Sequence, residues 1–446
     1  MSSRAWWAAG LLIVVLSLGL RVAYVEATPR AQPIHDAFDY DGHARSIAAT
    51  GAFSPTLAHR RPSAFRPPGY PYLLGAVYRL TDVREAAVER RFHVGQLLGA
   101  VIGALTVGMI GLLAAQLWGG LVAVVAAALA AVYVPLVTVG TAVMSEGLST
   151  LVSLAALAAA LQHRRSGHRW RWALLAGLLA GLAVLTRPNA AVLLLPLGLA
   201  VWTGRPRLSR SALGPPAALV AVAVLAVAPW TIRNAVVLDT FVPVTTQLGS
   251  AMAGTYNDDS RRDGDNPWSW RSIDHVAAYE DLAARVSKIP EAELERRVRE
   301  RAIDYIRDRP VSVAEVGFWN TIRMFELAGL QRARETSATI SIPGGPAIAG
   351  VFCFWLFALL AVAGAFTARA RAAPLLVWLV PVLFAASVVF LTLETPRYRT
   401  AVEPFVVLLA ALAVTAAIER RRQRGRHLGD AEPAGERART PAPARR

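Results

Sequence analysis

Cysteine and lysine are almost absent from this sequence of 446 residues. The single cysteine, Cys353, excludes an intrachain disulfide and lies in an apolar run, so we interpret it as a packing residue. The only lysine is Lys288, so the other basic residues are arginines. The sequence also lacks the Walker phosphate-binding loop, the HExxH zinc motif and the GxSxG nucleophile motif. It therefore carries no signature of a P-loop nucleotidase, an HExxH metalloprotease or a GxSxG serine hydrolase.

Charged residues are scarce, at 17% of the chain, whereas hydrophobic residues make up 54% and the mean hydropathy is +0.40. Several uncharged runs are long enough to cross a bilayer, which takes about 20 residues per helix. A net charge of +16 would suggest nucleic-acid binding in a soluble protein. Here the arginines lie in short loops between apolar runs, so membrane topology accounts for most of them. The composition therefore predicts an all-α polytopic membrane protein that does not bind nucleic acid.

The uncharged runs predict about ten transmembrane helices. The first covers residues 5–25, and we interpret it as an uncleaved helix rather than a signal peptide because many spans follow. Residues 94–145 carry no charge and are too many for one crossing, so they predict two helices, with Gly119 and Gly120 permitting the turn between them. The seven remaining runs cover residues 147–162, 172–186, 188–204, 211–232, 336–368, 372–393 and 404–418.

The basic loops predict an orientation in the cytoplasmic membrane. When Arg4 is placed in the cytoplasm, the basic loops 163–171 and 205–210 and the basic run 420–426 also lie on the cytoplasmic side. This agrees with the positive-inside bias of membrane proteins. We therefore expect both termini to be cytoplasmic.

The same orientation places two long segments on the outer side of the membrane, residues 26–92 and residues 233–345. We expect one transmembrane domain over residues 1–418. Residues 419–446 are rich in Ala, Pro and Arg, a composition typical of disorder, and are predicted to form a basic cytoplasmic tail.

Four carboxylates lie at the predicted outer ends of the first spans. Asp36, Asp39 and Asp41 follow the first span, and Asp36 and Tyr40 would share one face of a helix. Glu146 begins a later apolar span, where an ionisable group is costly and suggests a function. A carboxylate in a partly dry cavity can take a proton from a hydroxyl group and so activate a nucleophile. The alternatives are a solvated acidic loop for the aspartates and a hydrated interfacial residue for Glu146.

Four arginines lie at the outer ends of other spans, against the positive-inside trend: Arg187, Arg233, Arg397 and Arg399. Guanidinium groups bind phosphate in a bidentate manner, and a lipid-linked substrate would bring a phosphate to the membrane surface. The alternatives are that these side chains extend to the membrane–water interface, or that they pair with a nearby acid such as Glu394.

Two further patterns are less informative. The aspartates between residues 258 and 265 lack the ordered ligand spacing of a calcium loop, so we interpret them as a solvated loop. Gly177 and Gly181 have the spacing of a helix-packing face, which is common in membrane helices.

Taken in order, these motifs resemble the GT-C superfamily of integral-membrane glycosyltransferases. The sequence is most similar to the bacterial branch related to protein O-mannosyltransferases and the lipid A aminoarabinose transferase, over most of residues 5–418. The resemblance rests on Asp36-x-x-x-Tyr40-x-x-x-Ala44, Arg66-Pro67-Pro68-Gly69-Tyr70-Pro71, Ser145-Glu146, Arg187-Pro188-Asn189, Pro229-Trp230-x-x-Arg233-Asn234, Ala302-x-x-x-Ile306-x-x-x-Pro310 and Arg397-Tyr398-Arg399.

The resemblance implies an inverting transfer of a hexosyl or pentosyl group from a polyprenyl-phosphate donor, at the outer face of the membrane. The acceptor would be a hydroxyl group of a protein, a lipid or a glycan. A first-loop acid would be the base, here Asp36, with Asp39 and Asp41 as alternatives because the adjacent Asp-Glu pair of some members reads Asp36-Ala37. Glu146, a further candidate catalytic residue, could together with Ser145 hydrogen-bond an acceptor or orient a catalytic acid.

The leaving phosphate would be held by Arg187, Arg233 and either Arg397 or Arg399. The candidate substrate-binding residues are Tyr40, Arg66, Arg187, Arg233, Asn234, Arg397, Tyr398 and Arg399. Because a phosphate leaving group held by arginines does not strictly require a metal, we expect no cofactor, although a divalent metal stays open.

Two alternative functions are a transporter or flippase of lipid-linked sugars and a lipid-linked glycan ligase or polymerase. Transporters place ionisable groups near the bilayer midplane. Here the mid-span positions are mostly Ala, Leu, Val and Gly, and the charges cluster at one end. A ligase or polymerase would lack the acidic motif directly after the first span. The sequence therefore favours a glycosyltransferase.

Overall fold

The computed structural model describes residues 3–28, 34–57, 62–167, 169–204, 206–392 and 395–429. All the regular elements in this part of the chain are α-helices or short 3₁₀ helices. The all-α prediction is therefore confirmed for the residues described.

Each predicted span corresponds to a helix or to a pair of consecutive helices. These are α1 (Ser3–Ala27), α4 (Val88–Trp118), α5 (Gly120–Val132) with α6 (Val134–Thr141), α7 (Ser145–Arg165), α8 (Trp170–Thr186), η1 (Pro188–Leu193) with α9 (Leu194–Val201), α10 (Arg210–Leu238), α17 (Gly344–Ala365), α19 (Leu376–Val389) and α20 (Glu403–Gly429).

Not all of these helices have the length of a full membrane crossing. Among the described residues, α1, α4, α7, α10 and α17 are long and apolar enough to cross a bilayer, and the bent pair α5 and α6 makes a possible sixth span. Helices α8 and α19 and the pair η1 and α9 are apolar but shorter. Ten crossings therefore agree with the structure but stay a prediction.

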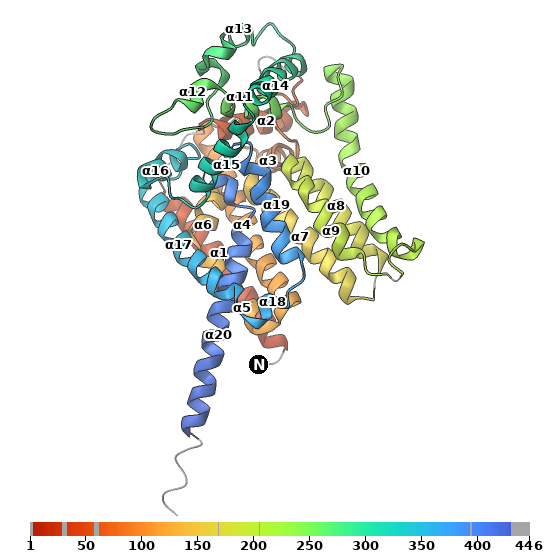
Figure 1. The fold of residues 1–446 in the computed structure, drawn as a ribbon, viewed down its shortest axis with the longest axis vertical. Coiled ribbons are helices and arrows are strands. Elements are labelled where there is room, and N and C mark those ends of the chain that lie inside the picture. The colour runs from red at the N-terminus through yellow and green to blue at the C-terminus, as the bar shows by residue number, and fades with distance from the viewer. Residues whose placement is uncertain are drawn as a thin grey trace, which may run out of the picture.

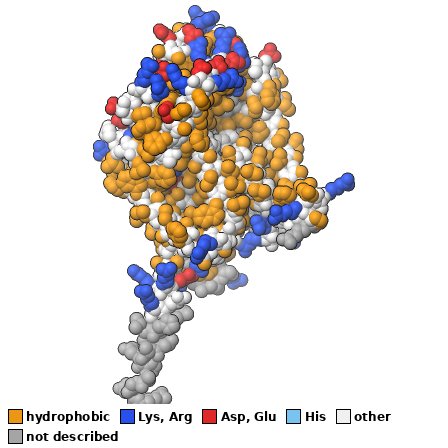
Figure 2. Space-filling view, in the orientation of Figure 1, with side chains coloured by type: hydrophobic (Ala, Val, Ile, Leu, Met, Phe, Trp, Pro, Cys, Tyr) orange, Lys and Arg blue, Asp and Glu red, His pale blue; other side chains and the backbone are white. Residues whose placement is uncertain are grey.

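The helices run between two ends of the molecule, which we call the upper and lower ends as they appear in Figure 1. The first residues of α1, helix α5 and α18 (Ala368–Arg371) lie at the lower end. Trp118 donates a hydrogen bond to the Arg369 carbonyl and Arg165 to the Gln116 carbonyl, so several predicted cytoplasmic loops meet there. A broad hydrophobic band separates the charged groups of the two ends (Figure 2). This is the surface expected of a helical membrane protein.

The two long segments predicted on the outer side form a layer of shorter helices at the upper end (Figure 1). The first segment contains α2 (Asp36–Thr50) and α3 (Gly69–Leu80), which pack against each other. The second segment contains α11 (Gln247–Thr255), α12 (Asp258–Arg261), η2 (Ile273–His275), η3 (Ala277–Tyr279), α13 (Glu280–Ala283), α14 (Glu291–Asp308), α15 (Val311–Met324) and α16 (Leu330–Ala338). A last short helix, η4 (Arg397–Arg399), precedes α20.

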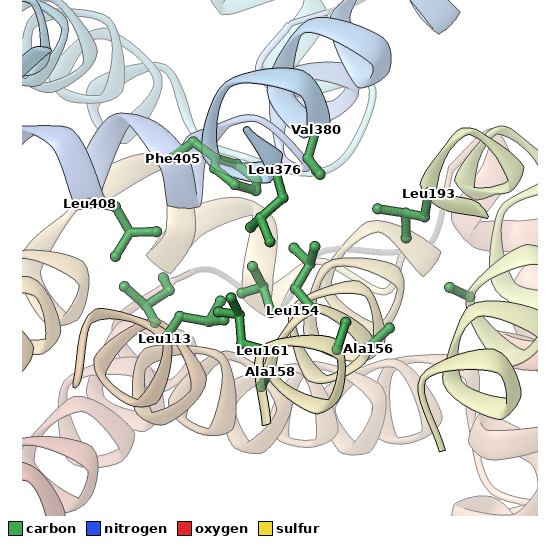
Figure 3. Packing of buried hydrophobic residues seen from close by; sticks show 14 of the residues in the cluster. Leu113, Leu154, Ala156, Ala158, Leu161, Leu193, Leu376, Val380, Phe405 and Leu408 are labelled. Atoms are coloured by element: carbon green, nitrogen blue, oxygen red, sulfur yellow. The ribbon is translucent and has the colours of Figure 1, made fainter. Parts of the chain in front are cut away.

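Helices α4, α7, α19 and α20 enclose the main hydrophobic core. Figure 3 shows Leu113 and Leu154 facing Leu376 and Leu408 across this core, and all four side chains are buried. On α7 and α8 most of the buried positions are alanine, glycine, serine or threonine, and such small residues let membrane helices approach closely. This core supports the upper-end layer from below.

Gly177 and Gly181 lie at the contact between α8 and α10. A Cβ atom on Gly177 would lie 2.3 Å from the Leu219 carbonyl oxygen, and one on Gly181 would lie 2.7 Å from the Ala223 carbonyl oxygen. Both distances are too short for a methyl group, so the glycines allow the two helices to pack closely. The spacing noted in the sequence therefore marks a helix-packing face.

Replacing Gly177 with alanine is expected to destabilise the protein by about 1–3 kcal/mol, because the added methyl group forces α8 and α10 apart. The unfolding midpoint in detergent micelles measures this effect. Gly198→Ala is a matched control, since a Cβ atom there meets nothing within 4 Å. Equal unfolding midpoints for the two variants would contradict the role of Gly177.

Helix α20 extends to Gly429 and so includes the first residues of the tail predicted to be disordered. Arginine, which is frequent in this stretch, has good helix propensity and can prolong a helix beyond the membrane. The rest of the tail, residues 430–446, lies outside the described residues, and the division into domain and tail stays a prediction.

Candidate active site

Six charged side chains from five separate segments meet at the upper end of the molecule, and we call them the ion-pair cluster. The segments are the first turn of α2, the loop before α3, the first turn of α7, the junction of α8 and η1, and η4. The residues are Asp36, Asp39, Arg66, Glu146, Arg187 and Arg397.

Asp36 lies between two arginines. Arg66 Nη2 is 2.5 Å from Asp36 Oδ1 and 2.6 Å from Asp39 Oδ2. Arg397 Nη2 donates a hydrogen bond to the other carboxylate oxygen of Asp36. Each oxygen of Asp36 therefore accepts a hydrogen bond from a different guanidinium group.

Glu146 is the buried acid of the cluster, with a side chain only 3% exposed. Its Oε1 atom lies 2.8 Å from Arg397 Nε and 2.6 Å from Arg187 Nη1. Arg397 thus joins Glu146 to Asp36, and the whole cluster is an alternating chain of three carboxylates and three guanidinium groups. Its formal net charge is zero when all six groups are ionised.

Tyrosine rings surround the arginines. The ring centroid of Tyr398 lies 5.3 Å from the guanidinium carbon of Arg187 and 4.9 Å from that of Arg397. The Tyr40 hydroxyl donates a hydrogen bond of 3.0 Å to Ser145 Oγ, and Arg66 lies 5.3 Å from the Tyr40 ring. The rings hold the guanidinium groups in place by cation–π contacts.

The local sequence explains how Arg187 reaches the cluster. Pro188 follows it, and a residue before proline avoids the helical conformation. Helix α8 accordingly ends at Thr186, and Arg187 has an extended backbone with φ −147° and ψ 118°. The side chain therefore projects from a break between two helices rather than from a helical turn.

The arginines control the charge of Asp36. Burial by itself would raise the pKa of this carboxyl group, but the positive charges of Arg397 and Arg66 and their hydrogen bonds outweigh it. The net effect holds the pKa of Asp36 well below its usual value. Asp36 is therefore ionised at neutral pH and is a weak base as long as both arginines bind it.

The structure does not bring Asp41 into the ion-pair cluster. Because successive helical residues are about 100° apart, Asp41 leaves the face of α2 that carries Asp36 and Tyr40. Its oxygens lie 2.7 Å from Arg91 Nη2 and 3.0 Å from the Tyr78 hydroxyl, and the residue is 3% exposed. Asp41 thus anchors α2 to α3 and α4, which argues against a role as base.

Arg399 points away from the cluster into a second buried group of charges. It lies 2.5 Å from Glu403 Oε1 and 3.0 Å from Glu326 Oε1, and its side chain is 1% exposed. Tyr133 also donates a hydrogen bond to Glu403. The i, i+4 spacing of Arg399 and Glu403 is a sequence signal for this pair, whereas Glu326 comes from a distant segment and has none.

Arg233 and Asn234 also lie apart from the ion-pair cluster, near the end of α10. Arg233 donates a hydrogen bond of 2.7 Å to the Ser63 carbonyl and lies 4.7 Å from the Trp230 ring. Asn234 is fully buried and donates to the Val242 carbonyl at 3.1 Å. Both side chains tie α10 to neighbouring loops by binding backbone carbonyls, which is a structural role.

The acids of the cluster are arranged around arginines rather than around a common centre. Within the described part of the chain, no three His, Cys, Asp or Glu side chains converge in a way that could hold a metal ion. Glu394, a possible partner of the arginines in the sequence, lies outside the described residues. The expectation that no cofactor is needed stays a prediction.

A comparison with known families finds a match to part of the chain. A family described as dolichyl-phosphate-mannose-protein mannosyltransferase matches residues 65–232. This stretch includes Arg66, Glu146 and Arg187, and it excludes Asp36 and Arg397. No curated protein sequence matches the chain at a significant level.

Solved structures with a similar fold include the oligosaccharyltransferase AglB from Archaeoglobus fulgidus. The complex of AglB with an inhibitory peptide and a dolichol-phosphate has 14% sequence identity and a TM-score of 0.55, over 99% of this chain and 53% of that chain. Its apo form has 13% identity and a TM-score of 0.54, over 96% and 52%. The chain thus spans about half the length of these proteins, and at such identities the likeness shows a common fold.

ArnT from Cupriavidus metallidurans, bound to undecaprenyl phosphate, has 14% identity and a TM-score of 0.43, over 96% of this chain and 80% of that chain. This score lies below the level at which a common fold follows. The family match over residues 65–232 covers less than half of the chain and shows a similarity to that family, and the likeness to AglB shows a common fold on a framework of apolar helices.

Proposed function

We propose that this chain transfers a sugar from a polyprenyl-phosphate donor to a hydroxyl group of an acceptor, with inversion at the anomeric carbon. The observation that carries this proposal is Asp36, a carboxylate held between two buried arginines at the upper end of the apolar helices. A base beside a phosphate-binding group is what such a transfer needs. The matched family and the AglB complex support the donor class, because their descriptions name dolichyl-phosphate mannose and dolichol-phosphate.

In this reaction Asp36 takes the proton of the acceptor hydroxyl as its oxygen forms a bond to the anomeric carbon. The bond between that carbon and the phosphate oxygen breaks, and the polyprenyl phosphate leaves with the electron pair. Arg66, Arg187 and Arg397 stabilise the charge that develops on the phosphate. A single displacement of this kind inverts the anomeric configuration.

The site would face the outside of the cytoplasmic membrane. This orientation rests on the positive-inside bias, since the basic loops after α7 and around α18 lie at the lower end, opposite the cluster. A donor lipid with its chain among the apolar helices would then present its phosphate at the level of the ion-pair cluster. Arg233, Asn234 and Arg399, placed apart from the cluster, would contribute to the site only indirectly.

Purified protein in lipid nanodiscs, given a panel of polyprenyl-phosphate hexoses and pentoses with hydroxyl acceptors, tests this function. We expect turnover of at least one donor, and a rise of about tenfold or more in donor KM for Arg187→Gln, because charge-assisted hydrogen bonds contribute about 1.5–3 kcal/mol. Arg262→Gln is a matched control, since its side chain is 70% exposed and pairs with Asp258 outside the cluster.

Absence of turnover with every donor, with and without divalent metal, would contradict the proposal. A polymeric or oligosaccharide product would instead favour a lipid-linked glycan ligase or polymerase, and movement of lipid-linked sugars across the bilayer without transfer would favour a flippase.

A further inference from the structure

We propose that the donor binds by exchange: its phosphate replaces Asp36 and Asp39 on Arg66 and Arg397, and this replacement frees Asp36 to act as the base. This inference rests on the proposed function and adds the order of events at the same site. In this scheme Glu146 is a positioning residue, which keeps Arg187 and Arg397 side by side when the aspartates are displaced.

The first step is that the arginines of the cluster are already bound by carboxylates. Arg66 uses Nε and Nη2 for Asp36 and Asp39, and Arg397 uses Nε and Nη2 for Glu146 and Asp36. The side chains of Arg66 and Arg397 are only 6% and 9% exposed. A phosphate can therefore bind these guanidinium groups fully only if it takes the place of a carboxylate.

The second step is that the three acids differ in how easily they can be displaced. Glu146 is 3% exposed and lies on a long membrane helix, so moving it would disturb the core. Asp36 and Asp39 are 24% and 35% exposed, more than the side chains of Arg66 and Arg397, and both lie in the first turn of α2. A phosphate that arrives from solvent or from the membrane surface thus meets the aspartates first.

The third step is charge balance. The ion-pair cluster alone is neutral, and a phosphodiester donor adds one negative charge. The three arginines then no longer balance all the negative charges, and one carboxylate is less stabilised by them. For Asp36 this means a rise in proton affinity at the moment when the donor is in place. During transfer the proton moves to Asp36 and a second negative charge forms on the leaving phosphate. The total charge of the site stays constant, because negative charge moves from Asp36 to the phosphate.

The exchange has a direct consequence for affinity, which distinguishes it from simple binding beside the aspartates. Polyprenyl phosphate, the product, cannot react, and its binding to protein in nanodiscs gives a dissociation constant. If Asp36 competes for Arg66 and Arg397, Asp36→Asn should bind polyprenyl phosphate about tenfold more tightly, which corresponds to about 1.4 kcal/mol. Asp39→Asn should also bind more tightly, by a smaller factor, since Asp39 pairs only with Arg66.

Asp258→Asn is the matched control for these measurements. Asp258 is a partly exposed aspartate of α12 that pairs with Arg309 at 2.8 Å, outside the cluster. Its replacement removes the same charge from the upper end, and we expect it to leave the dissociation constant unchanged. An equal gain in affinity for this variant would show that removal of any negative charge from the upper end strengthens binding, and it would overturn the exchange.

Unchanged or weaker binding by a folded Asp36→Asn variant would also overturn the exchange, and the proposed function would still stand if the wild type turned over a donor. If the wild type neither bound polyprenyl phosphate nor used any donor, both proposals would fail. The unfolding midpoint of each variant shows whether it is folded. Should Asp36→Asn not fold, Asp39→Asn decides, because tighter binding supports the exchange and unchanged binding overturns it.

Discussion

Replacing Asp36 with asparagine is expected to lower the rate of sugar transfer by about 10²–10⁴-fold, the usual contribution of a general base. Asparagine has nearly the same shape, and its one carboxamide oxygen can accept a hydrogen bond in place of one of the two Asp36 oxygens that Arg66 and Arg397 bind, but it cannot take the acceptor proton at neutral pH. Turnover of a saturating donor in nanodiscs measures the effect. Because the donor is saturating, a change in its affinity does not affect the comparison.

Asp39 is the alternative base that the structure leaves in reach, since it shares Arg66 with Asp36. Near-normal turnover by Asp36→Asn together with a large loss in Asp39→Asn would move the base to Asp39. Asp258→Asn, in the separate acidic loop, should keep the wild-type rate. A loss of rate in that control would indicate a general effect on the upper end rather than on the site.

The composition of the ion-pair cluster could be predicted only in part from the sequence. Counting the spans places Asp36, Glu146, Arg187 and Arg397 at the same end of the helices, and the structure brings these side chains together. The pairing itself depends on how five segments pack, which no local pattern encodes. The sequence therefore indicated the end of the membrane domain and most of the residue types, but not which arginine binds which acid.

Asp41 and Arg399 show two different limits of sequence-based reasoning. For Asp41 the helical period already separates it from Asp36, so the same periodicity that grouped Asp36 with Tyr40 could have set it aside. For Arg399 the decisive partner is Glu326, which lies far away in the chain and gives no sequence signal. Runs of apolar residues, in contrast, located each helix or helix pair of the predicted spans, because burial in a bilayer imposes a composition on the whole segment.

Arg397 and Arg399 are two residues apart, yet their replacement should affect different properties of the protein. Arg399→Ala is expected to destabilise the protein by about 3–5 kcal/mol, because it leaves Glu326 and Glu403 buried without their cation. Arg397→Ala leaves Asp36 bound by Arg66 and Glu146 bound by Arg187, so its main expected effect is loss of donor binding and transfer. Unfolding midpoints and polyprenyl phosphate binding, measured on both variants, separate the two roles.

The stability loss of Arg399→Ala should also depend on pH, with a sign fixed by Glu326. Burial already raises the pKa of Glu326 in the wild type despite Arg399, and removal of the arginine raises it further. The folded variant then binds a proton more tightly than the unfolded chain, so its stability falls as the pH rises above the unfolded glutamate pKa of about 4.3. The loss of stability relative to the wild type should therefore grow between about pH 5 and pH 8.

A stable Arg399→Ala variant that has lost polyprenyl phosphate binding would instead show that Arg399 belongs to the donor site, as the sequence predicted.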